Sequence, residues 1–227
     1  MTEAPVPAAG VMGEIDLGGY ISKAWKVVTA DLVLFVVGYL ICVAIVVGSL
    51  IVVIGPIFVA GPLAIGFIRV VQKRINGEPA VIGDIFAGFK EFSRGLVFVL
   101  LLLLVGLAVF IPLAIVAIVL SFIPCLGQVV TFVLQLAVSL GINTVLFFAW
   151  PLASLSENSP VDCIKKSITF GFAHFWPLLI LSFVTHLIGG AGIVACGVGI
   201  LFTAPLAIAI SLVAYKEYYL AKSQPAA

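Results

Sequence analysis

The sequence predicts an all-α, polytopic membrane protein. Its six transmembrane helices are expected to form three parallel-repeated hairpins, each preceded by an interfacial amphipathic helix. Hydrophobic residues make up 63% of the 227 residues and charged residues only 9%, whereas a soluble domain needs a more polar surface. Apolar runs of about 20 residues, long enough to cross a hydrocarbon core, recur along the chain. Polar breaks separate these runs, and basic residues gather at every second break.

A single membrane domain is expected over residues 15–222. Residues 1–14 are rich in proline and alanine and are expected to form a disordered cytoplasmic tail, with a second short tail at 223–227. The first stretch carries acid rather than base and lacks the basic region of a signal peptide, so we expect no cleavage.

The first unit begins with residues 17–31, where apolar residues at helical spacing alternate with lysines, a pattern typical of an interfacial helix. A first span is expected over residues 32–54, and Gly55-Pro56 ends it. A shorter second span follows over residues 59–73, and its positive charges lie only at its downstream end.

The second unit follows a polar turn at residues 73–79. Residues 84–92 carry phenylalanine at every third position, which predicts a second interfacial helix. A third span is expected over residues 96–122. After a turn at residues 124–127, a fourth span is expected to return to about Ser154.

The third unit opens with an interfacial helix expected over residues 162–175, which carries two adjacent lysines. A fifth span is expected over residues 176–197. Glycines at residues 197–199 predict the next turn, and the sixth span ends among three tyrosines near residue 219.

An internal repeat relates the first and third units. Pro62-Leu63-Ala64-Ile65 recurs as Pro205-Leu206-Ala207-Ile208, at an offset of 143 positions (205 − 62 = 143), and the same offset joins Lys23 to Lys166. The middle unit matches only in layout. All units start on the same side, so the sequence predicts a parallel repeat with units of about 17–74, 80–155 and 160–219.

Charge distribution predicts the orientation in the membrane. The turns on the opposite face carry no Lys, Arg, Asp or Glu. By the positive-inside rule the basic face is cytoplasmic, and both termini lie there. The basic residues on that face are Lys23, Lys26, Lys73, Arg74, Lys90, Arg94, Lys165, Lys166, Lys216 and Lys222, with Arg69 one helical turn away.

A polar seam marks the fourth span. It consists of Gln128, Thr131, Gln135, Ser139 and Asn143, whose spacing of three or four keeps them on one side of a helix. An unpaired amide is costly in hydrocarbon, so the seam must face the bundle interior, a water-filled path or another subunit. Interhelical hydrogen bonding or an oligomer contact is favoured over a permeation path.

His186 lies near the middle of the fifth span, beside Thr185, where an ionisable residue is a functional candidate. An imidazole bonded to Gln135 or Ser139 would serve the structure equally well. A proton relay or a metal site needs several such groups, and no second intramembrane acid or base accompanies His186. We therefore expect no catalytic residues, no metal ligands and no cofactor.

The four cysteines form no C-x-x-C pattern, so a zinc or redox motif is not indicated. Cys125 and Cys196 are expected near the same membrane face and could pair. The favoured interpretation is that the cysteines are small buried apolar residues.

Small residues and prolines recur in the second and sixth spans. Gly61 and Gly66 would let helices approach closely, while Pro62 and Pro205 interrupt helical hydrogen bonds in corresponding helices. Interrupted helices can mark a transporter site. No charged ligand residue lies nearby, so kinks that set the packing of the hairpins are the favoured interpretation.

Short motifs in the first half of the chain also carry a resemblance. They are Gly61-Pro62-Leu63, Gly66-Phe67, Arg69, Gly77-Glu78, Asp84-Ile85-Phe86 and Gly88-Phe89. Together they resemble a family of uncharacterised bacterial six-span inner-membrane proteins, which is similar to the membrane domain of some glycerophosphodiester phosphodiesterases. The resemblance implies a bacterial cytoplasmic (inner) membrane location and no established activity. The sequence contains no phosphodiesterase barrel or metal-binding carboxylates, so that activity is not carried over.

These observations lead to a functional hypothesis with two alternatives. The favoured hypothesis, given first, is a non-enzymatic integral membrane protein that self-assembles, acts as a scaffold or shapes the bilayer. Its expected partners are the lipid bilayer and either a second copy or another membrane protein. The second is a transporter or channel for a small or lipid-like solute that uses the polar seam and His186. The third is an intramembrane enzyme. A net charge of +1 predicts no nucleic-acid partner.

Overall fold

The computed structural model describes residues 15–123, 126–194 and 198–223. Within these residues the regular structure consists of helices without strands, and six helices are long and apolar enough to cross a membrane. The all-α, multi-pass class expected from the sequence is therefore confirmed. The expected tail at 1–14 and the possible Cys125–Cys196 pair lie outside the described residues, as does the expected tail at 223–227 except for Ser223, which ends α10.

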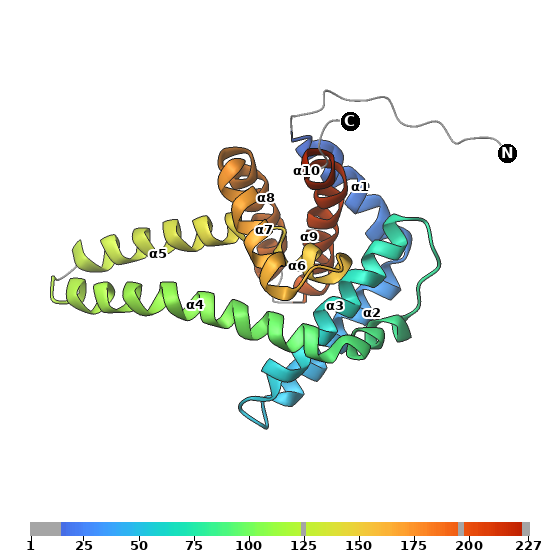
Figure 1. Cartoon of the computed structure of the whole chain (residues 1–227), viewed down its shortest axis with the longest axis horizontal. Coiled ribbons are helices and arrows are strands. Elements are labelled where there is room, and N and C mark those ends of the chain that lie inside the picture. Colours follow the sequence, from blue (N-terminus) through green and yellow to red (C-terminus); the bar gives the residue numbers. More distant parts are fainter. Residues whose placement is uncertain (1–14, 124–125, 195–197, 224–227) are drawn as a thin grey trace.

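The helices follow the chain in three groups (Figure 1). The first contains α1 (Leu17–Ala30), α2 (Leu32–Ser49) and α3 (Gly55–Ile75). The second contains η1 (Ile82–Glu91), α4 (Phe92–Ser121), α5 (Leu126–Val145) and α6 (Ala149–Leu155). The third contains α7 (Pro160–Ala173), α8 (Phe175–Val194), α9 (Ile200–Ala214), η2 (Tyr215–Tyr219) and α10 (Leu220–Ser223).

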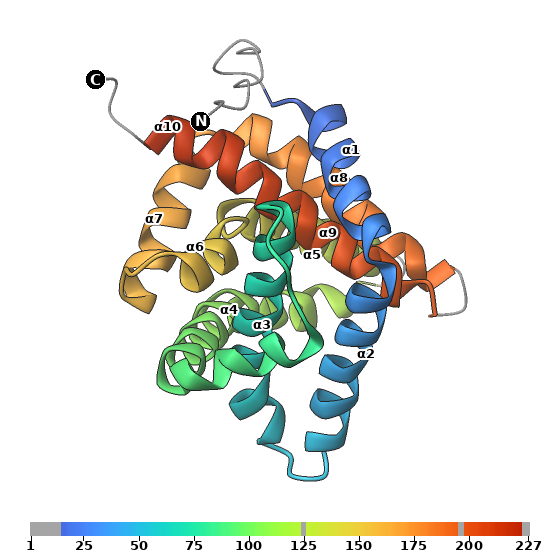
Figure 2. The ribbon, with the colours of Figure 1, turned by 90° about the vertical axis from the view of Figure 1, so that its right-hand side faces the viewer.

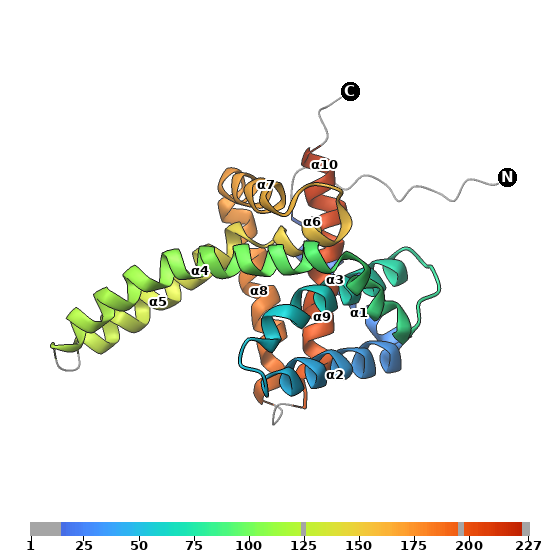
Figure 3. The same ribbon diagram turned by 60° about the horizontal axis from the view of Figure 1, so that its bottom comes forward.

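Consecutive long helices pack in pairs, α2 with α3, α4 with α5 and α8 with α9. The pairs point in different directions. The α4–α5 hairpin, drawn in green and yellow, extends away from the other helices in Figures 1 and 3. In Figure 2, α2 and α3 run downward while α8 and α9 run across the view. The helices therefore do not form one parallel bundle.

Helix α3 lies at the centre of this arrangement, in contact with α2, η1, α4, α6 and α9. The close contacts of α3 with η1 and α4 require glycine. A Cβ at Gly61 would overlap the backbone of Gly95 in α4, and a Cβ at Gly66 would overlap the carbonyl oxygen of Ile85 in η1. The approach is mutual, because a Cβ at Gly88 would overlap the carbonyl oxygen of Pro62. The backbones of α3 and the η1–α4 segment therefore touch directly.

The second proline of the repeated motif occupies a different environment. Pro205 is buried within α9, which packs on α8, α1 and α2. The contact with α1 buries Ala24 and Val28 completely. Asp16 begins α1 by accepting a hydrogen bond from the amide of Gly19, and burial of Tyr20 in the same helix raises its pKa. The amphipathic face of α1 thus covers the sixth span.

Three elements differ from the expected ones. The second interfacial helix is the 3₁₀ helix η1, which runs directly into α4. The fourth span is divided into α5 and α6, because Pro151 cannot donate the amide hydrogen bond that a continuous helix would need. The sixth span ends in the π-helical turn η2.

Substituting Gly66 with alanine should lower the free energy of unfolding by about 1–3 kcal/mol, because its Cβ forces α3 away from the carbonyl of Ile85. Unfolding in mixed detergent micelles would measure this loss. Gly48→Ala is the matched control, since a Cβ at Gly48 meets no atom within 4 Å and alanine favours a helix. Equal stability of the two variants would contradict the close contact.

Candidate functional site

A cavity of about 710 Å³ is lined by helices of all three hairpins. Its volume lies within the range of about 300–1,000 Å³ that is usual for ligand pockets. Most of its wall is apolar, as with Val43 in α2, Phe67 in α3 and Phe110 in α4. The three hairpins thus share one apolar cavity.

Apart from Tyr39 and Cys42 in α2 and Trp150 in α6, the polar side chains in the cavity wall come from three helices. Ser139 and Asn143 belong to α5, Thr185 and His186 to α8, and Ser211 to α9. Helix α8 packs against both α5 and α9, so it lies between the other two sources of polar groups. The cavity therefore combines a large apolar wall with a smaller polar one.

These polar groups are bonded mainly within their own helices. The Nδ1 atom of His186 lies 2.7 Å from the carbonyl oxygen of Ser182, one turn earlier. Thr185 donates to the carbonyl of Leu181 at 2.8 Å. His186 therefore pairs with neither Gln135 nor Ser139, the partners considered from the sequence, because a residue four positions earlier lies on the same helix face.

The polar seam of the fourth span is divided between two hollows. Ser139 and Asn143 border the main cavity, whereas Gln128, Thr131 and Gln135 border a groove of about 220 Å³ shared with α4. Both glutamines are exposed, and no hydrogen bond joins their amides to another described residue. Among the described residues, the two glutamine amides of the outer seam thus have no hydrogen-bond partner.

Other reactive groups do not converge. In the described ranges no group of three or more His, Cys, Asp or Glu side chains could hold a metal ion. Cys42 and Cys163 are free thiols, and both are buried. Cys42 lines the cavity, and the other titratable side chains in the cavity wall are those of Tyr39 and His186.

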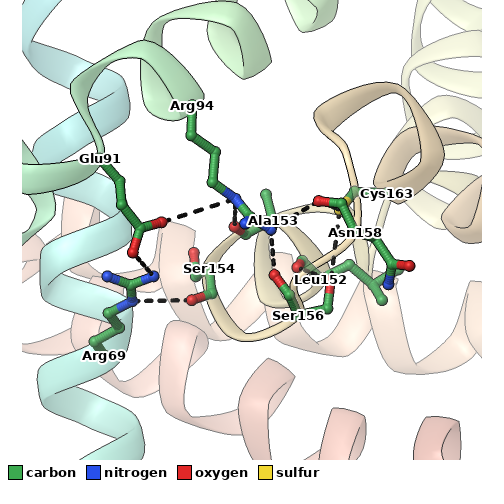
Figure 4. Close-up of polar contacts among 9 residues, drawn as sticks. All are labelled: Arg69, Glu91, Arg94, Leu152, Ala153, Ser154, Ser156, Asn158 and Cys163. Atoms are coloured by element: carbon green, nitrogen blue, oxygen red, sulfur yellow. Dashed lines mark hydrogen bonds and ion pairs between the residues drawn. The ribbon is translucent and has the colours of Figure 1, made fainter.

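Two arginines form a separate polar cluster (Figure 4). Arg94 Nε donates to the carbonyl of Ala153 at 2.9 Å, and its Nη2 donates to the carbonyls of Asn158 and Ser156. Arg69 Nε donates to the carbonyl of Ser154 at 3.0 Å. The last carbonyls of a helix lack partners within it and carry partial negative charge, so guanidinium groups stabilise the end of α6 and the following loop.

Glu91 completes the arginine cluster, with an ion pair of 2.7 Å to Arg69 and a longer one of 3.9 Å to Arg94. The cluster joins α3 and α4 to the α6–α7 connection. The sequence places Arg94 in the cytoplasmic charge pattern alone, and Arg69 both one helical turn from that pattern and in the motifs of the resemblance. The available signal was the end of a helix near residue 155, whose free carbonyls require donors.

Comparison with known proteins adds no identification. No protein-family model matches the sequence, and neither the curated proteins nor the solved structures give a match. The resemblance to bacterial six-span inner-membrane proteins therefore stays a prediction.

Replacing Arg94 with glutamine should lower the free energy of unfolding by about 1.5–3 kcal/mol, because charge-assisted hydrogen bonds to the α6–α7 loop are lost. Thermal denaturation in detergent would measure the effect. Lys90→Gln removes a charge at an exposed position of η1 and should leave the midpoint unchanged. Equal midpoints for the two variants would show that the cluster does not hold the loop.

Proposed function

We propose that this multi-pass membrane protein is a transporter. It binds an amphiphilic, lipid-like solute and moves this solute within the bilayer. The cavity of about 710 Å³ between the three hairpins is the observation that carries the proposal. A ligand with an apolar chain matches the wall formed by α2, α3 and α4, and a compact polar end matches the groups on α5, α8 and α9. A solute that enters from the bilayer also keeps its chain in an apolar environment throughout.

The proposed architecture is a parallel repeat of three units. Helix α7 begins and ends 143 positions after α1 (160 − 17 = 143 and 173 − 30 = 143), and α8 begins 143 positions after α2 (175 − 32 = 143). These coinciding bounds support duplication of the first unit. The distribution of basic residues supports cytoplasmic termini, and the resemblance to bacterial six-span proteins supports a location in a bacterial inner membrane.

A second candidate function is self-assembly of a non-enzymatic scaffold. The exposed amides of Gln128 and Gln135, which bond to no other residue that the structure describes, favour it, because amides in hydrocarbon are stabilised by hydrogen bonds to a neighbouring helix. A second copy offers the same groups on its own α4–α5 hairpin. The divergent directions of the hairpins also support a membrane-shaping role for such an assembly.

Filling the cavity should abolish binding. Gly106 lies in α4 on the cavity wall, and a Cβ there meets no atom within 4 Å, so Gly106→Phe adds bulk without a clash at its first carbon. Labelling by a photoactivatable long-chain probe in lipid nanodiscs should fall about tenfold or more, which corresponds to about 1.4 kcal/mol.

Gly141→Phe is the matched control for this experiment. Gly141 has equally open surroundings in α5 but lies outside the cavity wall, so labelling should match that of the unaltered protein. Mass spectrometry of the labelled peptides should locate the probe on α3, α4 and α8. A probe spread evenly over the lipid-facing helices, or one insensitive to Gly106→Phe, would contradict the proposed function.

The self-assembly candidate predicts that the double variant Gln128→Leu and Gln135→Leu dissociates. Each lost interhelical hydrogen bond is worth about 0.6 kcal/mol, and four glutamines meet in a dimer, so the dissociation constant should rise by roughly tenfold or more. Sedimentation equilibrium in detergent measures it. Asn143→Leu, which alters the cavity end of the seam, should not affect the dissociation constant. A monomeric unaltered protein would contradict this candidate.

A further inference from the structure

We propose that the cavity selects an uncharged headgroup that donates a hydrogen bond, so that its ligand is a long-chain or isoprenoid alcohol rather than a fatty acid or a phospholipid. This inference rests on the proposed binding function and specifies its ligand. The headgroup preference follows from the hydrogen-bond donors and acceptors of the polar wall. Some of them already bond within the protein, and the others are open to a ligand.

The donors of α8 and α9 are used within the protein. Thr185 donates its hydroxyl hydrogen to the carbonyl of Leu181, and Ser211 donates to the carbonyl of Ile208, each at 2.8 Å. The Nδ1 atom of His186 lies 2.7 Å from the carbonyl oxygen of Ser182, and a carbonyl only accepts. In a neutral imidazole, this contact assigns the proton to Nδ1.

Acceptors remain on the same side of the cavity. With its proton on Nδ1, the His186 ring carries a free lone pair on Nε2. The hydroxyl oxygens of Thr185 and Ser211 each keep lone pairs after donating their hydrogens. A ligand that meets α8 and α9 must therefore supply the hydrogen, as an O–H group does and an ether or ester does not.

Helix α5 supplies a complementary set. The Asn143 amide nitrogen lies 2.8 Å from the carbonyl oxygen of Ser139 and 3.5 Å from its hydroxyl oxygen. One N–H can serve both oxygens of Ser139, and the second N–H and Oδ1 of this exposed side chain are then open to a ligand. A hydroxyl group can donate to His186 and accept from Asn143 at once. An alcohol thus satisfies both sides of the polar wall.

Charge excludes the common anionic amphiphiles. Among the described residues that line the cavity, none is Lys, Arg, Asp or Glu. A carboxylate or phosphate would have to leave water without a counter-charge, and an uncompensated charge within a membrane is costly. The acceptors on α8 would also repel an anionic oxygen.

The test uses the full chain in nanodiscs and competition against the photoactivatable long-chain probe. Four competitors with the same sixteen-carbon chain are compared: 1-hexadecanol, its methyl ether, hexadecanoate and hexadecyl phosphate. The alcohol should compete about three- to tenfold better than the ether, the range expected for one net hydrogen bond. The two anions should compete least.

Two substitutions assign that preference to the polar wall. Thr185→Val keeps the side-chain shape, His186→Phe keeps a ring, and each should bring the alcohol and the ether closer to equal affinity. Gln135→Leu, in the outer groove of the same seam, should leave the preference unchanged. Thermal midpoints verify that each variant is folded, and the isosteric Thr185→Val suffices if His186→Phe is unstable.

The outcomes separate this inference from the function on which it rests. Failure of all four competitors, with labelling unaffected by Gly106→Phe, would overturn the proposed binding function itself. If all four competitors displace the probe, the cavity stands as a binding site. The headgroup assignment would still be overturned if the ether competed as well as the alcohol, or if an anion competed better than either. A preference for the alcohol that persists in both polar-wall variants would also overturn it.

Discussion

The direct backbone contact between α3 and the η1–α4 segment is the constraint on which the other features depend. In hydrocarbon, helices gain little from burying apolar side chains, because lipid is equally apolar, so close approach must supply the attraction. Gly61 and Gly66 on one side, with Gly88 and Gly95 on the other, leave no side chain between the two backbones. The contact fixes the start of α4 against the middle of α3 and so determines where the α4–α5 hairpin leaves the fold.

The arginine cluster acts at the same end of the molecule. The glycine contact brings the start of α4 to α3, and from there Arg94 reaches the carbonyls that follow α6, while Arg69 reaches α6 from α3. A guanidinium group carries several N–H donors in a fixed plane, so it can bond to several of the carbonyls at the end of α6 and in the following loop. These carbonyls would otherwise lack donors. Joining the three groups of helices here leaves the opposite ends of the hairpins free to diverge, and the cavity lies between them.

Sequence reasoning recovers the parts of this structure that depend on local chemistry. Apolar run lengths identify the spans, and the bounds of α1 and α7 fall within two residues of those expected. The break between α5 and α6, just before Pro151, was recoverable in principle, since the proline ring crowds the carbonyl of Phe147, four residues earlier, and supplies no amide hydrogen for it. The cavity could not be predicted from the sequence, because its wall depends on the relative directions of the hairpins. For the polar seam, helical periodicity identified the shared helix face. It did not predict that the seam residues divide between the cavity and the outer groove.

The α4–α5 hairpin has a mechanical consequence. It is anchored near its base, where α4 meets α3 and α7 and where α5 meets α7 and α8, and its remaining length extends beyond these contacts. A long element held at one end behaves as a lever, and helices accommodate a change in bilayer thickness by tilting. Leu102, Gly106 and Phe110, in the middle of α4, form its part of the cavity wall. A tilt of this hairpin in a thinner or thicker bilayer would therefore shift one wall of the cavity.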